Sequence, residues 1–82
     1  MTNDPWDKPV ELLIEDSSHF QCIKNSRDAV ACMATSWPVR HDREYAAARR
    51  ACLMALDGKL SSTRARSAFV AAAEKAGILR VL

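Results

Sequence analysis

Glycine is scarce in this 82-residue chain, and its two glycines, Gly58 and Gly77, stand far apart. A phosphate-cradling loop and a dinucleotide-binding fingerprint both need several glycines within a few residues. The sequence therefore predicts no nucleotide site, and it contains no motif for any other cofactor. It also lacks an apolar run near the roughly 18 residues that a membrane-spanning helix needs. Because residues 1–7 are polar and acidic and do not resemble a secretory signal, we expect a cytoplasmic protein that has no membrane partner.

Cysteine and histidine are also sparse. Cys22, Cys32 and Cys52 are widely spaced and odd in number, which argues against a disulfide framework. Zinc sites need paired ligands such as Cys-x-x-Cys, and His19 with Cys22 supplies only two ligands. Each cysteine has apolar neighbours in the sequence, so we expect three reduced, buried thiols and no metal site.

One cluster of titratable residues, residues 41–44, could carry chemistry. A general base needs a carboxylate or imidazole held against a substrate, usually with a second group to orient it. The same residues are equally explained as the start of a helix, where capping and acidic side chains are favoured. We therefore predict no catalytic residue and a non-enzymatic protein. The enzyme hypothesis would require His41 and Glu44 to converge on a cavity.

Length and composition indicate one folded domain. The chain is 49% hydrophobic and 27% charged, which is ordinary for a folded protein, and its length suffices for one hydrophobic core. We treat residues 1–82 as a single domain in which residues 1–8 form an extended lead-in that is held by Pro9.

Two short segments near the N-terminus have the pattern of strands. Val10, Leu12 and Ile14 occupy alternate positions, which is the period of a strand with one buried face. Residues 16–18 supply turn chemistry, and residues 19–24 alternate again. Two strands joined by a short polar turn predict a β-hairpin.

A first helix is expected directly after the hairpin. Asn25 or Ser26 can cap its N-terminus, and Pro38 disfavours helical geometry at the residue before it, so we expect the helix to end at Trp37. The apolar stripe of this helix consists of Val30, Met33, Ala34 and Trp37.

Two alanine-rich helices follow, and each is followed by a glycine that can adopt the left-handed conformation. Their candidate caps are His41 or Asp42 for the second helix and Ser61 or Ser62 for the third. Their predicted buried stripes are Tyr45, Ala48, Cys52, Ala55 and Leu56 in the second helix and Ala65, Ala68, Phe69, Ala72 and Ala76 in the third. Residues 78–82 are apolar except for Arg80 and predict a last strand. The predicted fold class is α+β: a β-hairpin, three helices and a short C-terminal strand.

Charge is distributed unevenly along the chain. Residues 1–38 carry three basic and six acidic side chains, and residues 39–82 carry nine basic and four acidic ones. The candidate basic binding face consists of Arg43, Arg50, Arg64 and Lys75. Such side chains can contact successive phosphates of a nucleic acid. They are equally explained as a solvated face with local ion pairs, for example between Arg50 and Asp57, whereas the position of Arg66 predicts a half-buried side chain that bonds helix-end carbonyls.

Several apolar side chains do not share the predicted core direction. These candidate interaction residues are Leu13, Leu53, Met54 and Val70. Four such side chains on one surface would mark an interface, and a small sheet also leaves edges free for pairing with a second copy. Our leading hypothesis is therefore a non-enzymatic protein-interaction domain that binds itself, as a homodimer, or another protein. The alternative is weak, sequence-independent nucleic-acid binding through the basic helical face.

Four motifs, which together span the chain from Trp6 to about Val81, show a family resemblance. They are Trp6-x-x-Pro9-Val10, the Ser26-x-x-x-Val30 helix that ends at Trp37-Pro38, Ala48-x-x-x-Cys52-x-x-Ala55-Leu56-x-Gly58, and Ala65-Arg66-x-Ala68-Phe69-x-x-Ala72-Ala73-x-x-Ala76-Gly77-Ile78. In these motifs the chain resembles the small bacterial domain-of-unknown-function family 982. The resemblance implies a free-standing, single-domain cytoplasmic protein, and it brings no activity, ligand or catalytic residue to this chain.

Overall fold

The computed structural model describes residues 5–13, 20–35, 37 and 42–80. Its elements are strands β1 (Pro5–Leu13) and β2 (Phe20–Asn25) and helices α1 (Ser26–Thr35), α2 (Arg43–Leu56) and α3 (Ser62–Ala76). The hairpin and three helices confirm the α+β prediction. Strand β1 begins at Pro5, so it includes part of the segment that the sequence suggested was a lead-in.

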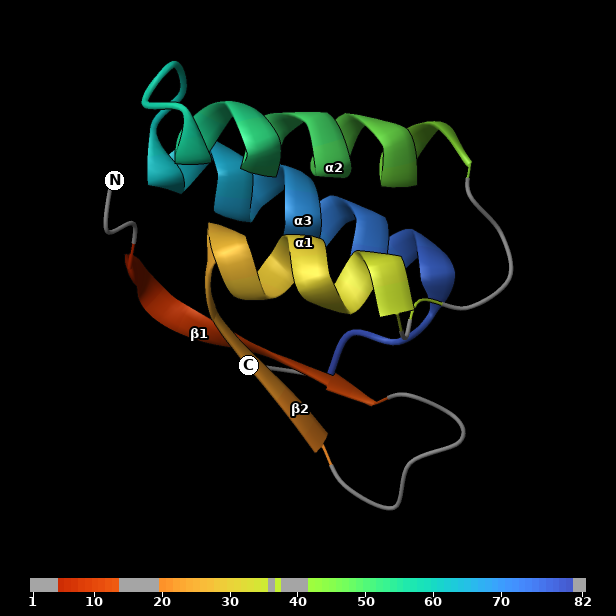
Figure 1. The fold of residues 1–82 in the computed structure, drawn as a ribbon. Coiled ribbons are helices and arrows are strands. Elements are labelled where there is room, and N and C mark those ends of the chain that lie inside the picture. The colour runs from red at the N-terminus through yellow and green to blue at the C-terminus, as the bar shows by residue number, and fades with distance from the viewer. Residues whose placement is uncertain (1–4, 14–19, 36, 38–41, 81–82) are drawn as a thin grey trace.

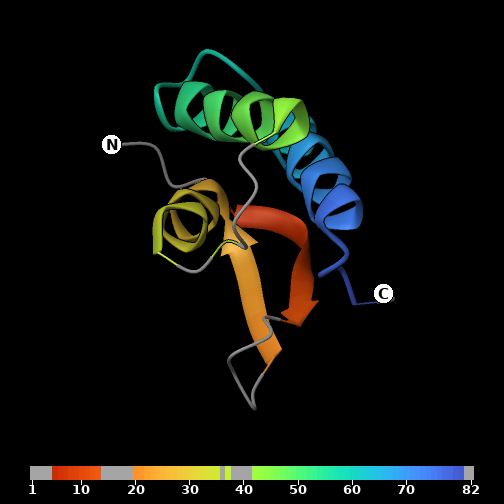
Figure 2. The same ribbon diagram turned by 90° about the vertical axis from the view of Figure 1, so that its right-hand side faces the viewer.

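The elements stack in layers on one face of the hairpin (Figure 1). Helix α1 packs on β2 and α3 packs on β1, and α2 contacts both helices on the side away from the sheet. The view along the helices shows α1 and α3 between the hairpin and α2 (Figure 2). One face of the hairpin is therefore covered by helices, and α2 has the outermost position.

The two strands pair antiparallel with one irregularity. The register runs from Val10 opposite Ile23 to Leu13 opposite Phe20, and it shifts between Pro5 and Val10. Val10, Leu12 and Ile23 are buried under the helices, as the alternation of the first strand predicts. Because successive strand side chains point to opposite faces, the residues between them lie on the open face of the hairpin.

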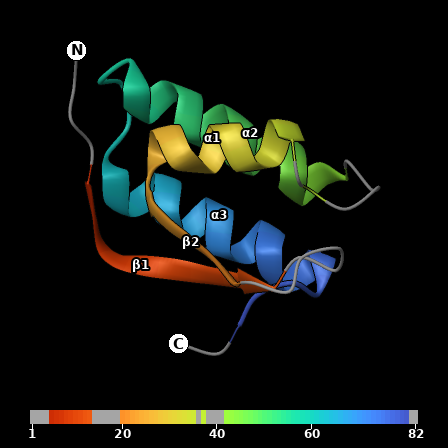
Figure 3. The same ribbon diagram turned by 60° about the horizontal axis from the view of Figure 1, so that its bottom comes forward.

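The C-terminal segment pairs with the second edge of β1. The amide of Leu13 donates to the carbonyl of Ile78 at 2.8 Å, and the amide of Arg80 donates to the carbonyl of Glu11 at 3.0 Å. These two bonds flank a single bridge between Leu12 and Leu79, and they bring the C-terminal segment alongside β1 (Figure 3). The predicted last strand is thus reduced to a bridge in the described residues, and its last two residues, 81 and 82, lie outside them.

Helix boundaries follow the capping chemistry of the sequence. Asn25 Oδ1 accepts the amide of Asp28 at 2.7 Å, the side chain of Asp42 accepts the amide of Tyr45, and that of Ser61 accepts the amide of Arg64. Each choice settles a pair of cap candidates that the sequence left open.

The helix ends agree with the sequence at two of three places. Gly58 and Gly77 have φ angles of 77° and 74°, the left-handed conformation that glycine adopts without a steric penalty. Helix α1, however, ends at Thr35 and not at Trp37. Its buried stripe also differs from the predicted one, because Ala34 is exposed while Ala29 and Cys32 are buried.

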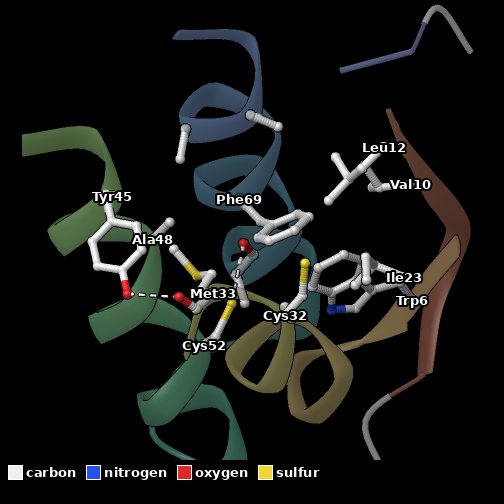
Figure 4. Packing of buried hydrophobic residues seen from close by; sticks show 14 of the residues in the cluster. Trp6, Val10, Leu12, Ile23, Cys32, Met33, Tyr45, Ala48, Cys52 and Phe69 are labelled. Atoms are coloured by element: carbon white, nitrogen blue, oxygen red, sulfur yellow. Dashed lines mark hydrogen bonds between the residues drawn. The ribbon is translucent and has the colours of Figure 1, made fainter. Parts of the chain in front are cut away.

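Aromatic rings connect the layers of the core (Figure 4). Trp6 of β1 contacts Phe69 of α3 with ring centroids 5.4 Å apart, and Phe69 contacts Trp37 at 5.6 Å. Trp37 in turn contacts Tyr45 of α2 at 5.8 Å. The Tyr45 hydroxyl donates to the carbonyl of Met33 at 2.9 Å. Rings from the strand, two helices and the segment between helices thus fill the space that the small alanine side chains leave.

Candidate functional site: a groove beside the second helix

Helix α2 presents one face to the core and the opposite face outward. Its buried residues are Tyr45, Ala48, Cys52 and Ala55, which recur at helical spacing. Arg43 and Arg50 lie seven positions apart, on the side of the helix opposite this stripe, and both are exposed. The alanine-rich sequence of α2 therefore holds long basic side chains on the outermost layer of the fold.

A surface groove of about 610 Å³ runs beside this helix. We call it the α2 groove. It is lined by Tyr45, Ala46, Arg49, Arg50, Leu53, Met54, Asp57 and Lys59. The left-handed turn at Gly58 ends α2 and brings Lys59 to the end of the groove, next to the last turn of the helix.

The charge in the α2 groove is predominantly positive. Three exposed cations, Arg49, Arg50 and Lys59, line it together with one carboxylate, Asp57. Within the described residues the one ion pair joins Arg80 to Glu11 at 3.0 Å, on another layer of the fold. The Arg50–Asp57 pair suggested by the sequence is not formed. The groove cations are therefore available to an external anionic group, and their attraction for it is screened by salt.

Apolar side chains lie among these cations. Leu53 is 40% exposed and Met54 is half-buried. Leu13 is the other large apolar side chain that is exposed in the part of the chain that the structure describes, and it lies on β1, in the layer farthest from α2 (Figure 1). The α2 groove thus combines an exposed leucine with unpaired positive charge.

The structure brings only some of the sequence-predicted site residues together. Arg50, Leu53 and Met54 share the α2 groove, and exposed Arg43 lies two turns before Arg50 on the same helix. The candidate residues that do not line the groove are Leu13, Arg43, Arg64, Val70 and Lys75. Of these, Leu13 lies on the hairpin, and Arg64 and Lys75 are exposed on the outward face of α3. The four apolar candidates therefore do not form one surface.

Two sequence expectations about side-chain burial need correction. Val70 is half-buried and packs against the core, so it does not point away from it. Cys22 is exposed because its position on β2 faces away from the helices, whereas Cys32 and Cys52 are buried as expected. Burial raises the pKa of the Cys32 thiol to about 11. All three cysteines are free.

Arg66 is half-buried, as expected, but its partner differs from the predicted one. Its Nε donates to the carbonyl of Lys8 at 2.8 Å, so it joins α3 to β1 and does not bond a helix end. Lys8 lies in the part of β1 where the register shifts, and the bond gives its carbonyl a partner.

Two cations of the α2 groove, Arg49 and Lys59, were not among the candidate site residues predicted from the sequence. Arg49 lies four positions from both Tyr45 and Leu53, and this i, i+4 spacing is the signal that could have grouped it with them. Lys59 follows Gly58, and its place depends on the turn.

The titratable residues at positions 41–44 do not form a site within the described part of the chain. His41 and His19 lie outside the described residues. Asp42 serves as the N-cap of α2, as the helix-start explanation predicts. Among the residues that the structure describes, no three histidine, cysteine or acidic side chains are grouped so that they could hold a metal ion. None of the described helices combines the length and the apolar character needed to cross a membrane.

The comparisons with known proteins agree with this fold. A family described as protein of unknown function (DUF982) matches residues 8–80. The chain is also similar to the NMR structure of the Agrobacterium tumefaciens protein Atu1219, with a TM-score of 0.80 and 30% sequence identity. The match covers 96% of this chain and 78% of that one. No curated protein matches the chain.

Proposed function

The chain belongs to the DUF982 family of proteins of unknown function, and we propose that it is a non-enzymatic protein-interaction domain. Its α2 groove binds an acidic segment of a partner protein that also carries apolar side chains. The observation that supports this proposal is the position of Leu53, 40% exposed between cations that form no ion pair within the described residues. Free thiols at three widely spaced cysteines suit a reducing compartment, so the proposal includes a cytoplasmic location.

The charge of the α2 groove indicates the chemistry of the partner. Three cations and one carboxylate line the groove, so its net charge is positive and it attracts an acidic segment. Leu53 and Met54 supply apolar surface that such a segment can bury, and burial of apolar surface favours association. Arg49 and Arg50 belong to a residue type that is enriched among the residues that contribute most to binding. A nucleic acid would use the cations, but its phosphates gain nothing from an exposed leucine, and this difference favours a protein partner.

The decisive experiment compares the two exposed leucines. Each is replaced by aspartate, Leu53→Asp in the groove and Leu13→Asp on the hairpin, and both variants are used to capture proteins from nuclease-treated bacterial lysate. We expect Leu53→Asp to lose the captured protein, by about tenfold or more, and Leu13→Asp to retain it. Equal retention by both variants would exclude the α2 groove as the binding site.

Charge reversal separates a protein partner from a nucleic acid. We expect Arg49→Glu with Arg50→Glu to reduce capture more than Arg64→Glu, which changes an exposed arginine on α3. A labelled oligonucleotide is tested in parallel at low salt. The oligonucleotide result would replace the proposal by nucleic-acid binding under two conditions. Retention must be lost when Arg43 and Arg50 are replaced by glutamate, and it must be unchanged by Leu53→Asp. Sedimentation of the wild type and of Leu53→Asp tests whether the occupant is a second copy. A dimeric wild type and a monomeric Leu53→Asp variant would identify a second copy of this chain in the groove.

A further inference from the structure

Among the described residues, the outer edge of β2 is the free edge of this sheet. Strand β1 lies between β2 on one side and residues 78–80 on the other. Within the part of the chain that the structure describes, no backbone hydrogen bond joins the outer edge of β2 to another segment. A strand edge of this kind presents a row of unpaired donors and acceptors.

The hydrogen bonds of β1 identify which groups of β2 are unpaired. Glu11 and Leu13 bond to residues 78–80, so they direct their backbone groups away from β2. Backbone groups alternate in direction along a strand, so the β1 residues that face β2 are Val10 and Leu12, opposite Ile23 and Gln21. On β2, Cys22 lies between Gln21 and Ile23, and Lys24 follows Ile23. Cys22 and Lys24 therefore each direct their N–H and C=O outward from the sheet.

A second groove, of about 350 Å³, lies along this edge. It is lined by Gln21, Cys22, Ile23, Asp28, Ala31, Cys32 and Thr35. Cys22 and Ile23 belong to opposite faces of the sheet, so a hollow that touches both, together with α1, follows the strand edge. Helix α1 stands beside β2 along this side of the hairpin (Figure 2). The Cys32 thiol lies 3.3 Å from Gln21 Oε1 and links the helix to the strand. We call this hollow the β2 groove.

We propose that the β2 groove binds an extended segment of another protein, which adds a strand to the sheet. The segment bonds the backbone of Cys22 and Lys24 and places small apolar side chains against Ala31. This is the known mode in which an extended peptide pairs with a strand edge and its alternate side chains enter a groove. Asp28 is exposed on the groove wall, and the described residues that line the groove include no cation, so the segment carries a lysine or arginine there.

Two observations favour such a segment over a second copy of this chain. The groove volume is at the small end of the roughly 300–1,000 Å³ of ligand pockets, which suits a single extended segment. Lys24 is exposed on this edge, and lysine on an edge strand discourages pairing between identical edges.

The test uses a phage-displayed library of random linear peptides, panned on the full chain, followed by affinity measurement with a selected synthetic peptide. Two matched pairs of variants locate the binding. Ala31→Gln fills the β2 groove without changing its charge, whereas Ala34→Gln changes another exposed alanine of α1 outside it. Lys24→Pro removes an outward N–H that β1 does not use, and Lys24→Ala changes the same side chain but keeps the N–H.

We expect the selected peptides to carry lysine or arginine next to small apolar residues. Their affinity should fall about tenfold with Ala31→Gln and with Lys24→Pro, and it should be unchanged with Ala34→Gln and Lys24→Ala. Leu53→Asp should also leave it unchanged, which separates this groove from the α2 groove. If Lys24→Pro does not fold, the comparison of Ala31→Gln with Ala34→Gln decides alone. Failure to select any peptide, binding that neither groove variant changes, or a wild-type dimer that Ala31→Gln dissociates would each overturn the proposal.

Discussion

The indole of Trp6 donates a hydrogen bond to Ser26 Oγ at 3.2 Å in the buried interior. Trp6 lies where the register of β1 shifts, and Ser26 is the first residue of α1 and has no exposed surface. A polar pair of this kind joins the beginning of the sheet to the beginning of the first helix. Because both residues are buried, neither polar group has water as an alternative partner.

Ser26→Ala should therefore destabilise the protein. The substitution leaves the Trp6 N–H buried without this acceptor, which costs about 1–3 kcal/mol. Urea denaturation followed by circular dichroism measures the change in the free energy of unfolding. Ser67→Ala is the control, because Ser67 is exposed on α3, and we expect a change within about 0.5 kcal/mol. Equal effects of the two substitutions would contradict the importance of the Trp6–Ser26 bond.

Phe69→Ala should be among the most damaging substitutions in the chain. Phe69 is fully buried and contacts both Trp6 and Trp37, so its removal leaves a cavity between two rings. We expect a loss of about 3–5 kcal/mol, a large part of the roughly 5–15 kcal/mol by which a domain is stable. Phe69→Leu keeps much of the apolar volume and should cost less. Tryptophan fluorescence during denaturation follows both contacts, and similar midpoints for the two variants would disprove the cavity explanation.

A pair of arginines on α3 separates a structural role from a surface role. Arg66 donates to the carbonyl of Lys8 across the layers, while Arg64 is exposed on the same helix. Arg66→Ala should lower the free energy of unfolding by about 1 kcal/mol, and Arg64→Ala should change it by no more than about 0.5 kcal/mol. Thermal denaturation of both variants at one salt concentration makes the comparison, and a larger loss from Arg64→Ala would contradict it.

Cys32 makes stability depend on alkaline pH. Burial raises the pKa of its thiol to about 11, whereas the thiol of the unfolded chain titrates near its ordinary value of 9.0. The unfolded state loses this proton first, so the contribution of Cys32 is fully present below about pH 9 and is lost as the pH rises through about 11.

Chemical denaturation of wild type and Cys32→Ala between pH 8 and pH 11 measures this effect. Lysines and other groups titrate in the same range, so the informative quantity is the difference in slope between the two proteins. We expect the wild type to lose more stability than the variant over this interval. Parallel slopes would show that the thiol titrates alike in the folded and unfolded states.

Local chemistry in the sequence determined most of the elements. The cap side chains of Asp42 and Ser61, and the glycines after α2 and α3, act within a few residues, so the sequence shows them directly. The alanine-rich stripes of α2 and α3 also predicted most of their buried faces, although Leu56, Ala68 and Ala76 are half-buried and Ala73, which was not predicted, is buried. The predicted end of α1 was wrong because Pro38 marks only the latest position at which a helix can end. Trp37 lies outside the helix, and its ring packs against Phe69.

The remaining differences depend on contacts between distant residues. Which face of β2 is buried follows from its register with β1, so the exposure of Cys22 was not visible in its apolar neighbours. The partner of Arg66 lies 58 positions away in the sequence. Likewise, the α2 groove depends on a turn that brings Lys59 beside Leu53, and the β2 groove depends on which edge of β1 the last residues occupy.

The position of β1 between two partners has a consequence for the order of folding. Leu12 meets Leu79, at the other end of the chain, whereas β2 and the helices pair mainly with neighbours in sequence. During synthesis the hairpin and the first helices can assemble as they emerge, but the second edge of β1 stays uncovered until residues 78–80 have left the ribosome. Closing this long loop has an entropic cost that grows with its length, and until it closes the emerging chain exposes a strand edge on which chaperones or aggregation can act.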